Sequence, residues 1–355
     1  MNIAPRFARG LALLALAIMA TAASAKTPLT EIIPSDTGAL FCADVFRLKS
    51  SPLADRVIGS GSHITADRDF DQLMNDMGLT LRRDIDKIVI AVVPAADHAA
   101  PSGILVGADG RFDPSKINRA LGSRGATAVA VPGGTIYRVP QDRSGHPAST
   151  AGPDPASSPK SDPDLFVAIP SSSRLLFGTE SELTRALSST LSDSPLSSGR
   201  GIGKLAGMAK TSAAAWFVVD TSQFISSSAD KKNHPEASGR QDAAANAIRS
   251  LATVTGLSGS FEPGRNVEVR LSARTDTDEN ADLVEDSIRG LLAIWRLAAV
   301  DRSPELVTAL RKFKVDHTGT VVTLEGTVLS ADLEKFLEQR TAAQARAADA
   351  QTPDH

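Results

Sequence analysis

The sequence predicts an α+β protein with mainly antiparallel sheets, helices packed on one face and an internal duplication. Short apolar and β-branched runs recur along the chain, and most are joined by tight turns rather than by long helical crossovers. Each half repeats one order of elements, namely strand, helix, strand, strand, helix, hairpin, helix. The halves share this order but few identical residues, and the boundary between them is expected near residues 197–201.

The first unit is expected over residues 26–196. Its predicted strands are residues 38–44, 87–93, 103–108, 127–131, 135–139, 165–169 and 174–177. Proline follows a helix-capping residue at Ser51 and again at Asp113, and Thr179 with Glu182 predicts a capping box. Apolar side chains at i, i+3, i+4 and i+7 predict a further helix over residues 70–77.

The second unit is expected over residues 197–340. Its predicted strands are residues 213–219, 252–261, 266–273, 313–315 and 320–328. A long helix is predicted from 278 to 299, and shorter ones after Ser303 and over 331–339. The apolar face expected for the long helix comprises Leu283, Ile288, Leu291, Leu292 and Trp295. We expect this face to pack on a sheet, and a membrane-surface helix is the alternative.

The first 25 residues have the pattern of a secretory signal peptide. Arg6 and Arg9 precede an apolar run that is too short to span a bilayer, and Ala23-Ser24-Ala25 supplies small residues for cleavage. The next residue is Lys26 rather than the cysteine of a lipoprotein. We therefore expect cleavage after Ala25 and a soluble mature protein that is periplasmic or secreted, without a transmembrane span.

Two segments are predicted to be disordered. Residues 141–163 carry five prolines and almost no apolar side chains, so they cannot bury enough surface to offset the entropy of ordering. They are expected to interrupt the first unit as a surface insertion. Residues 341–355 are expected to begin as a frayed helix and to end as a disordered tail.

Composition disfavours several classes of function. Without the leader the chain has 36 basic and 41 acidic side chains, a formal net charge of −5. This balance disfavours nucleic acid or anionic lipid as the main partner. Aromatic residues make up only 4% of the chain, which disfavours a large sugar-binding groove. The single cysteine, Cys42, cannot form an internal disulfide, and its apolar surroundings predict a buried thiol.

Two motifs resemble ligand-binding loops. The glycine-rich run 199–204 lacks the first glycine of a phosphate loop, because Ser198 stands there, and Leu205 replaces the Ser or Thr after the lysine. We interpret it as a flexible boundary. Alternating polar residues occur twice and would suit calcium, but both sets lack the turn glycine and the closing acid. These sets are Asp67, Asp69 and Asp71, and Asp276, Asp278 and Asn280. Helix capping is the alternative that we favour for both sets.

The remaining polar residues give no catalytic pattern. No two histidines are spaced three or four residues apart, and no Gly-x-Ser-x-Gly motif occurs. The Gly59–His63 run brings serine next to histidine but is interpreted as a loop. Asp44 and Asp220 end equivalent strands, so they either face each other across a cleft or cap the following turns. We assign no catalytic, cofactor-binding or metal-binding residue and no cofactor.

Part of the first unit resembles a group of uncharacterised exported bacterial proteins. The similar passages are Met77-Gly78-Leu79, then Asp84 to Ile90, and then Arg111 to Ile117, where a Phe-Asp-Pro helix start follows a strand. The resemblance covers about residues 35–140, and most of its motifs are helix caps and strand starts. It implies an exported α+β protein and no functional residue.

These observations predict an exported non-enzymatic protein that binds a ligand or associates with the envelope. An envelope protein is the expected partner. The alternative is a periplasmic or secreted hydrolase whose catalytic groups meet only in space. A periplasmic carrier of small ligands would show alternating parallel β-α units, which this chain lacks.

Overall fold

The computed structural model describes residues 27–51, 68–95, 101–140, 165–188, 195–224, 253–300 and 304–335. The predicted signal peptide, the insertion at 141–163 and the tail at 341–355 lie outside these ranges. So do the Gly59–His63 run, Asp67 and the helix predicted after Ser51.

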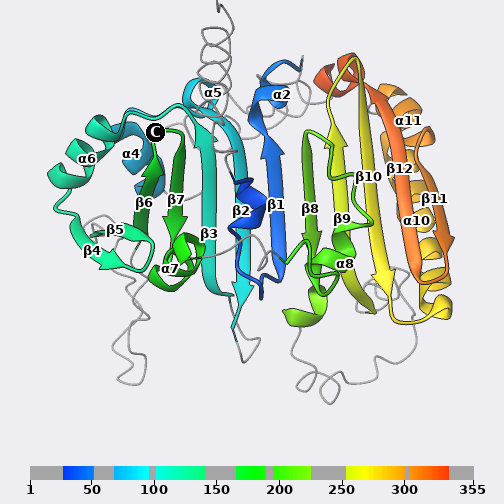
Figure 1. The fold of residues 1–355 in the computed structure, drawn as a ribbon. Coiled ribbons are helices and arrows are strands. Elements are labelled where there is room, and N and C mark those ends of the chain that lie inside the picture. Colours follow the sequence, from blue (N-terminus) through cyan, green and yellow to red (C-terminus); the bar gives the residue numbers. More distant parts are fainter. Residues whose placement is uncertain are drawn as a thin grey trace, which may run out of the picture.

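The described strands form one twelve-stranded antiparallel sheet, which confirms the α+β class (Figure 1). Its order is β11-β12-β10-β9-β8-β1-β2-β3-β7-β6-β5-β4. The strands are β1 (Ala39–Asp44), β2 (Ile85–Pro94), β3 (Pro101–Gly110), β4 (Thr127–Val131), β5 (Gly134–Val139), β6 (Leu165–Ser171), β7 (Arg174–Gly178), β8 (Ala215–Val219), β9 (Val254–Glu262), β10 (Asn266–Thr275), β11 (Lys314–Thr318) and β12 (Val321–Leu329). Each overlaps a run that the sequence predicts, but β11 continues through residues 316–318, which were expected to form the turn of the last hairpin.

Ten helical elements accompany the sheet within the described ranges. They are η1 (Leu29–Glu31), α2 (Val45–Lys49), α4 (Arg68–Asp76), α5 (Leu81–Asp84), α6 (Pro114–Ser123), α7 (Glu180–Ser188), α8 (Ile202–Ala206), η4 (Thr221–Gln223), α10 (Asp278–Ala299) and α11 (Pro304–Arg311). The Asp113 side chain caps α6 by accepting hydrogen bonds from the Ser115 and Lys116 amides, as its sequence predicts. Glu182 does not make the predicted capping-box bond in the described contacts, since its carboxylate accepts from Ser181 and Arg185 instead.

The two halves of the chain meet in the middle of the sheet, where β1 pairs with β8. Phe41 lies opposite Phe217 at the centre of this pairing. At one end the Asp44 amide donates to the Ala214 carbonyl at 2.7 Å, and at the other the Asp220 amide donates to Gly38, also at 2.7 Å. From this junction β1-β2-β3-β7-β6 extend to one side and β8-β9-β10-β12-β11 to the other.

Helices cover both faces of the sheet in the first half, which differs from the expected one-face packing. Successive residues of β7 show this, because Leu176 shares a core cluster with residues of η1 and α7, whereas Leu175 and Phe177 share another with residues of α4 and α6. A strand that is covered on both faces needs a continuous apolar run rather than an alternating one. All five residues of β7 are buried.

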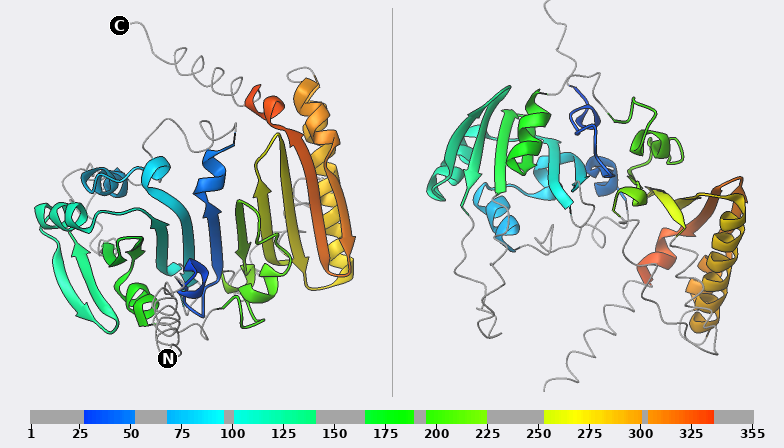
Figure 2. Two further views of the ribbon diagram at one scale, coloured as in Figure 1. Left: turned by 45° about the horizontal axis from the view of Figure 1, so that its top comes forward. Right: turned by 90° about the horizontal axis from the view of Figure 1, so that it is seen from below.

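In the second half, α10 and α11 lie along the outer strands, at the edge of the molecule (Figure 2). Helix α10 contacts β10, β11 and β12. The core beneath it is small, with Val254, Ala273, Ala281, Val284 and Val322 buried together. Helix α10 therefore rests on the sheet through a narrow set of mostly small side chains.

Candidate functional site

The beginning of α10 is a capped helix start. The Thr277 side chain accepts a hydrogen bond from the Asn280 amide at 3.2 Å, and Asp276 accepts one from the Asn280 side chain at 2.6 Å. The bond from Asn280 is the main cause that lowers the pKa of Asp276. These contacts support the capping interpretation of the Asp276, Asp278 and Asn280 run.

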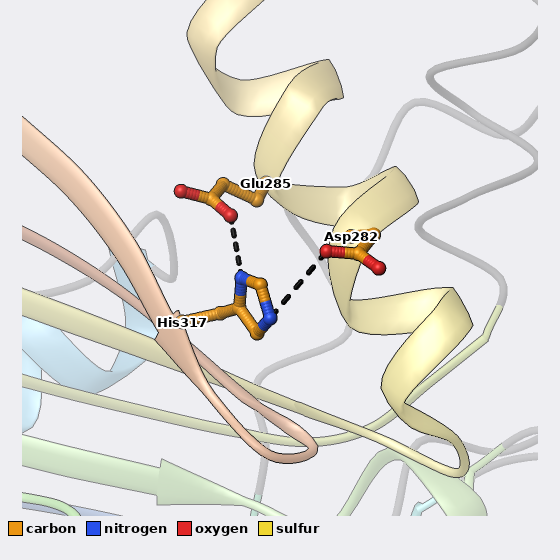
Figure 3. Close-up of side chains that lie close together, drawn as sticks. All are labelled: Asp282, Glu285 and His317. Carbon is orange, nitrogen blue, oxygen red and sulfur yellow. Dashed lines mark hydrogen bonds and ion pairs between the residues drawn. The ribbon is translucent and has the colours of Figure 1, made fainter.

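One turn further, α10 contributes to a cluster of three side chains that could ligate a metal. Asp282 and Glu285 are three residues apart, so they share a face of the helix, and His317 reaches them from β11 (Figure 3). His317 Nδ1 lies 2.5 Å from Glu285 Oε2, and His317 Nε2 lies 3.4 Å from Asp282 Oδ1. The imidazole is therefore held between two carboxylates, one at each ring nitrogen.

The three side chains differ in exposure. The Glu285 side chain is 6% exposed, that of His317 28% and that of Asp282 66%. Arg289, one turn along α10, forms an ion pair with the second oxygen of Glu285. The hydrogen bond with Glu285 is the main cause that raises the pKa of His317, and the charges of Asp282 and Asp316 act in the same direction.

The sequence interpretation missed this cluster. It placed His317 in a turn and assigned no role to Asp282 or Glu285. The i, i+3 spacing of the two carboxylates was visible, but 32 residues separate Glu285 from His317. Only the pairing of β11 with β12 and the packing of α10 on them bring these side chains together.

Near its C-terminal end, α10 is held to the rest of the fold by Arg296. Arg296 donates from Nε and Nη2 to the Leu310 carbonyl, at 3.2 and 2.8 Å, and from Nη2 to the Phe313 carbonyl at 3.4 Å. The Leu310 carbonyl lies in the last turn of α11, where carbonyl groups have no partner within the helix, and Phe313 follows two residues after the helix ends. Arg296 therefore ties α10 to α11.

The exposed parts of α10 carry large apolar side chains, which we call the α10 surface. Its five largest members are between 53% and 76% exposed, namely Leu283, Ile294, Trp295, Leu297 and Val300. This corrects the predicted apolar face, in which Leu283 and Trp295 were expected to pack on the sheet. The buried residues of the helix are instead Ala281, Val284, Glu285, Leu292 and Ala299.

The α10 surface has a regular spacing. Leu283, Gly290 and Leu297 recur every seven residues, and Ala293 and Val300 follow the last two by three positions. Between Gly290 and Val300 the exposed residues are all apolar. The single polar residue of this segment, Arg296, is half-buried. A seven-residue repeat of apolar positions is typical of a helix that pairs with another helix.

A second apolar area lies on the central strands. Phe41, Ile104, Leu257 and Leu271 are between 36% and 44% exposed, and the registers of β1, β3, β9 and β10 place them on one face of the sheet. These side chains are more covered than those of the α10 surface. We therefore treat the α10 surface as the stronger candidate for an interaction.

The other residues that were considered from the sequence as possible functional groups have structural roles. Cys42 is buried, and burial raises its pKa to about 12. Asp44 caps α2 by accepting from the Arg47 amide at 3.0 Å, and Asp220 accepts from Ser222 and Gln223. Because β1 and β8 are antiparallel, these two aspartates lie at opposite ends of the pairing, so the hypothesis that they face each other across a cleft is wrong.

The glycine-rich run at 199–204 forms a turn that leads into the short helix α8. Gly199 and Gly201 have φ values of +64° and +49°, which favour glycine. The Arg200 amide donates to Ser198 Oγ at 3.2 Å. The run is therefore a glycine turn before a helix, and the boundary between units expected there stays a prediction. In the first acidic run, Asp71 is buried within α4.

Comparisons with known proteins add little to this description. No protein-family model matches the chain, and no curated protein sequence matches it. A solved structure described as crystal form I of TP0453 is similar over 89% of this chain and 98% of that chain, with 10% identity and a TM-score of 0.40. A similarity at this level supports no conclusion about function. Among the helices of the described ranges, none is long and apolar enough to cross a membrane.

Proposed function

We propose that the chain is an exported, non-enzymatic binding protein of the cell envelope and that the α10 surface is its docking element. The observation that carries this proposal is the exposed apolar repeat of Leu283, Gly290 and Leu297. Contiguous exposed apolar residues on a folded protein mark sites of interaction. The partner is an envelope protein that presents an amphipathic helix, because a seven-residue apolar repeat fits the groove of a second helix.

The composition of the α10 surface also favours a protein partner. Trp295 and Arg289 are both exposed on α10. Tryptophan and arginine are enriched among the residues that contribute most to binding between proteins. Gly290 and Ala293, in the middle of the repeat, leave room for a close approach of two helices.

Export is part of the proposal, with cleavage after Ala25 and a periplasmic or secreted mature protein. The order of basic, apolar and small segments in residues 1–25 supports this. Leu29, Ile32 and Ile33, which follow the expected cleavage site, are buried in the core. The mature chain would retain all three.

We also propose that the two halves arose by duplication of one α+β unit. The strand orders β1-β2-β3-β7-β6 and β8-β9-β10-β12-β11 correspond position by position, outward from the central junction. The two hydrogen bonds that close the junction, from Asp44 and from Asp220, join equivalent positions of the two units. The β4-β5 hairpin would be an addition to the first unit.

The hydrolase alternative has less support from the site. A general base needs one ring nitrogen directed at a nucleophile. Both nitrogens of His317 lie against carboxylates, those of Glu285 and Asp282, and neither of these residues carries a hydroxyl group. The cluster therefore favours an electrostatic or ligand-binding role.

The proposal can be tested by affinity capture from the envelope of the source cell. The wild-type protein is compared with the double variant Ile294→Ser/Leu297→Ser, and Phe46→Ser on α2 is the matched control, because Phe46 is another strongly exposed apolar residue. We expect one stoichiometric protein partner that the double variant loses and the control retains. A partner that all three proteins retain would contradict the assignment of the docking element, and the absence of any partner would contradict the proposed function.

A further inference from the structure

We propose that Asp282, Glu285 and His317 form a binding site for a borderline divalent cation such as Zn²⁺, with His317 Nε2 and the Asp282 carboxylate as ligands and Glu285 as the group that orients the imidazole. The site is independent of the docking function proposed above. Asp282 and Glu285 lie in the first half of α10, and His317 lies on β11.

The distance between the two proposed ligand atoms suits a metal ion. Two ligands of a tetrahedral zinc ion at bond lengths near 2.0 Å lie about 3.3 Å apart. His317 Nε2 and Asp282 Oδ1 are 3.4 Å apart. One ligand atom from each member of the cluster lies within 4.8 Å of the others. A cation can therefore enter between Asp282 and His317 with little movement of either side chain.

Glu285 supplies the support that a metal-binding histidine needs. Histidine ligands usually donate their second ring N–H to a carboxylate, which sets the tautomer and the ring orientation. Glu285 Oε2 lies 2.5 Å from His317 Nδ1. The Glu285 side chain is buried and paired with Arg289, so its carboxylate is held in place. With Nδ1 occupied in this way, the lone pair of Nε2 is directed toward Asp282.

The donor set indicates which cations the site would select. Imidazole suits zinc, copper, nickel and cobalt, whereas magnesium and calcium prefer oxygen ligands throughout. Asp282 is well exposed and His317 partly exposed, so water can complete the coordination. Because one ligand comes from α10 and the other from β11, the bound ion would join the helix to the hairpin.

The test is titration of the mature protein with ZnCl2, followed by calorimetry and by thermal unfolding. We expect one site in the wild type and an upward shift of Tm with zinc. His317→Gln and Asp282→Asn should abolish this site, and Glu285→Gln should weaken binding about 10–100-fold, as loss of a supporting carboxylate does in other metal sites. Asp286→Asn, an exposed acid on the same helix, is the matched control and should bind zinc like the wild type.

Two results would overturn the proposal. One is a wild-type protein that gains no stability from zinc and shows no binding by calorimetry. The other is zinc binding that persists in both His317→Gln and Asp282→Asn. Asp282 is exposed, so its variant should fold even if a change at His317 disturbs the hairpin. Titration with MgCl2 provides a further check, since equal affinity for Mg²⁺ would exclude a role for the imidazole.

Discussion

Arg174 on β7 makes a buried ion pair with Asp109 on the neighbouring strand β3. Its Nε donates to Asp109 Oδ1 at 2.8 Å and its Nη2 to Asp109 Oδ2 at 2.9 Å. The same Nη2 donates to the Thr27 carbonyl at 2.5 Å. Arg174 and Asp109 face each other in the register of β3 and β7, so this pair joins the chain on the two sides of the 141–163 insertion.

Replacement of Arg174 by alanine should be strongly destabilising. The arginine side chain is 9% exposed and that of Asp109 16%, so the variant removes the Arg174 guanidinium from a carboxylate that stays largely buried. Removal of one partner from a buried pair costs about 3–5 kcal/mol of unfolding free energy. The double variant Arg174→Met/Asp109→Leu should regain most of this loss, because apolar side chains of similar size leave no uncompensated charge.

Urea denaturation followed by circular dichroism measures these differences. The matched control is Arg270→Ala, which removes another cross-strand pair, with Glu325, whose N–O distance is 2.7 Å but whose two side chains are about half exposed. An exposed pair contributes less than about 1 kcal/mol. If Arg174→Ala and Arg270→Ala lose the same small amount, or if the double variant at 174 and 109 is less stable than either single variant, the reasoning from burial is refuted.

Four further changes have defined outcomes. The buried Cys42 thiol, with its pKa raised to about 12, should react with a disulfide reagent only after urea unfolds the chain, and rapid labelling of the native protein would contradict this. The pKa of His317 is raised in the folded protein, so its charged form stabilises the fold. This stability is fully present below the pKa of the unfolded chain, about 6.5, and is lost as the pH rises through the pKa of the folded protein. His317→Gln should therefore flatten this part of the profile of Tm against pH. Gly122→Ala in α6 adds a methyl group into open space and should raise the unfolding free energy by about 0.5–1 kcal/mol. In contrast, Gly326→Ala places its Cβ 2.4 Å from the Phe313 ring and should lower it by about 1–3 kcal/mol in the same urea titration.

Local patterns were sufficient to predict the strands and most of the longer helices, because each is encoded in neighbouring residues. The run from Ala39 to Asp44 and the Asp113-Pro114 helix start are examples, and both form as predicted. Short elements such as η1 and α5 were missed. At three and four residues, they are too short to show a helical period.

The arrangement of the sheet could not be predicted in the same way. The pairing of Phe41 with Phe217 joins strands that are far apart in sequence, and neither strand carries a local signal for its partner. The helices on both faces did leave a signal that the sequence interpretation did not use. Leu175, Leu176 and Phe177 are consecutive apolar residues, and a strand with one face in solvent would alternate instead.

The face of α10 was predicted wrongly for a physical reason. Large apolar residues surround most of the helix, so periodicity alone does not show which of them contact the sheet. The contact is made mainly through small side chains, such as Ala281 and Val284, and this leaves Trp295 and Leu297 outside. The cluster at His317 was missed because its members converge only after β11 pairs with β12 and α10 packs on both.

The most direct test of the proposed docking function is site-specific photo-crosslinking in intact envelopes. A photoreactive residue replaces Leu297 in one variant and Phe46 in the other, and the mass of each crosslinked product identifies what lies against that position. The account predicts that position 297 crosslinks to a single protein partner and that position 46 does not. Crosslinks at 297 to lipid alone, or the same products at both positions, would contradict it.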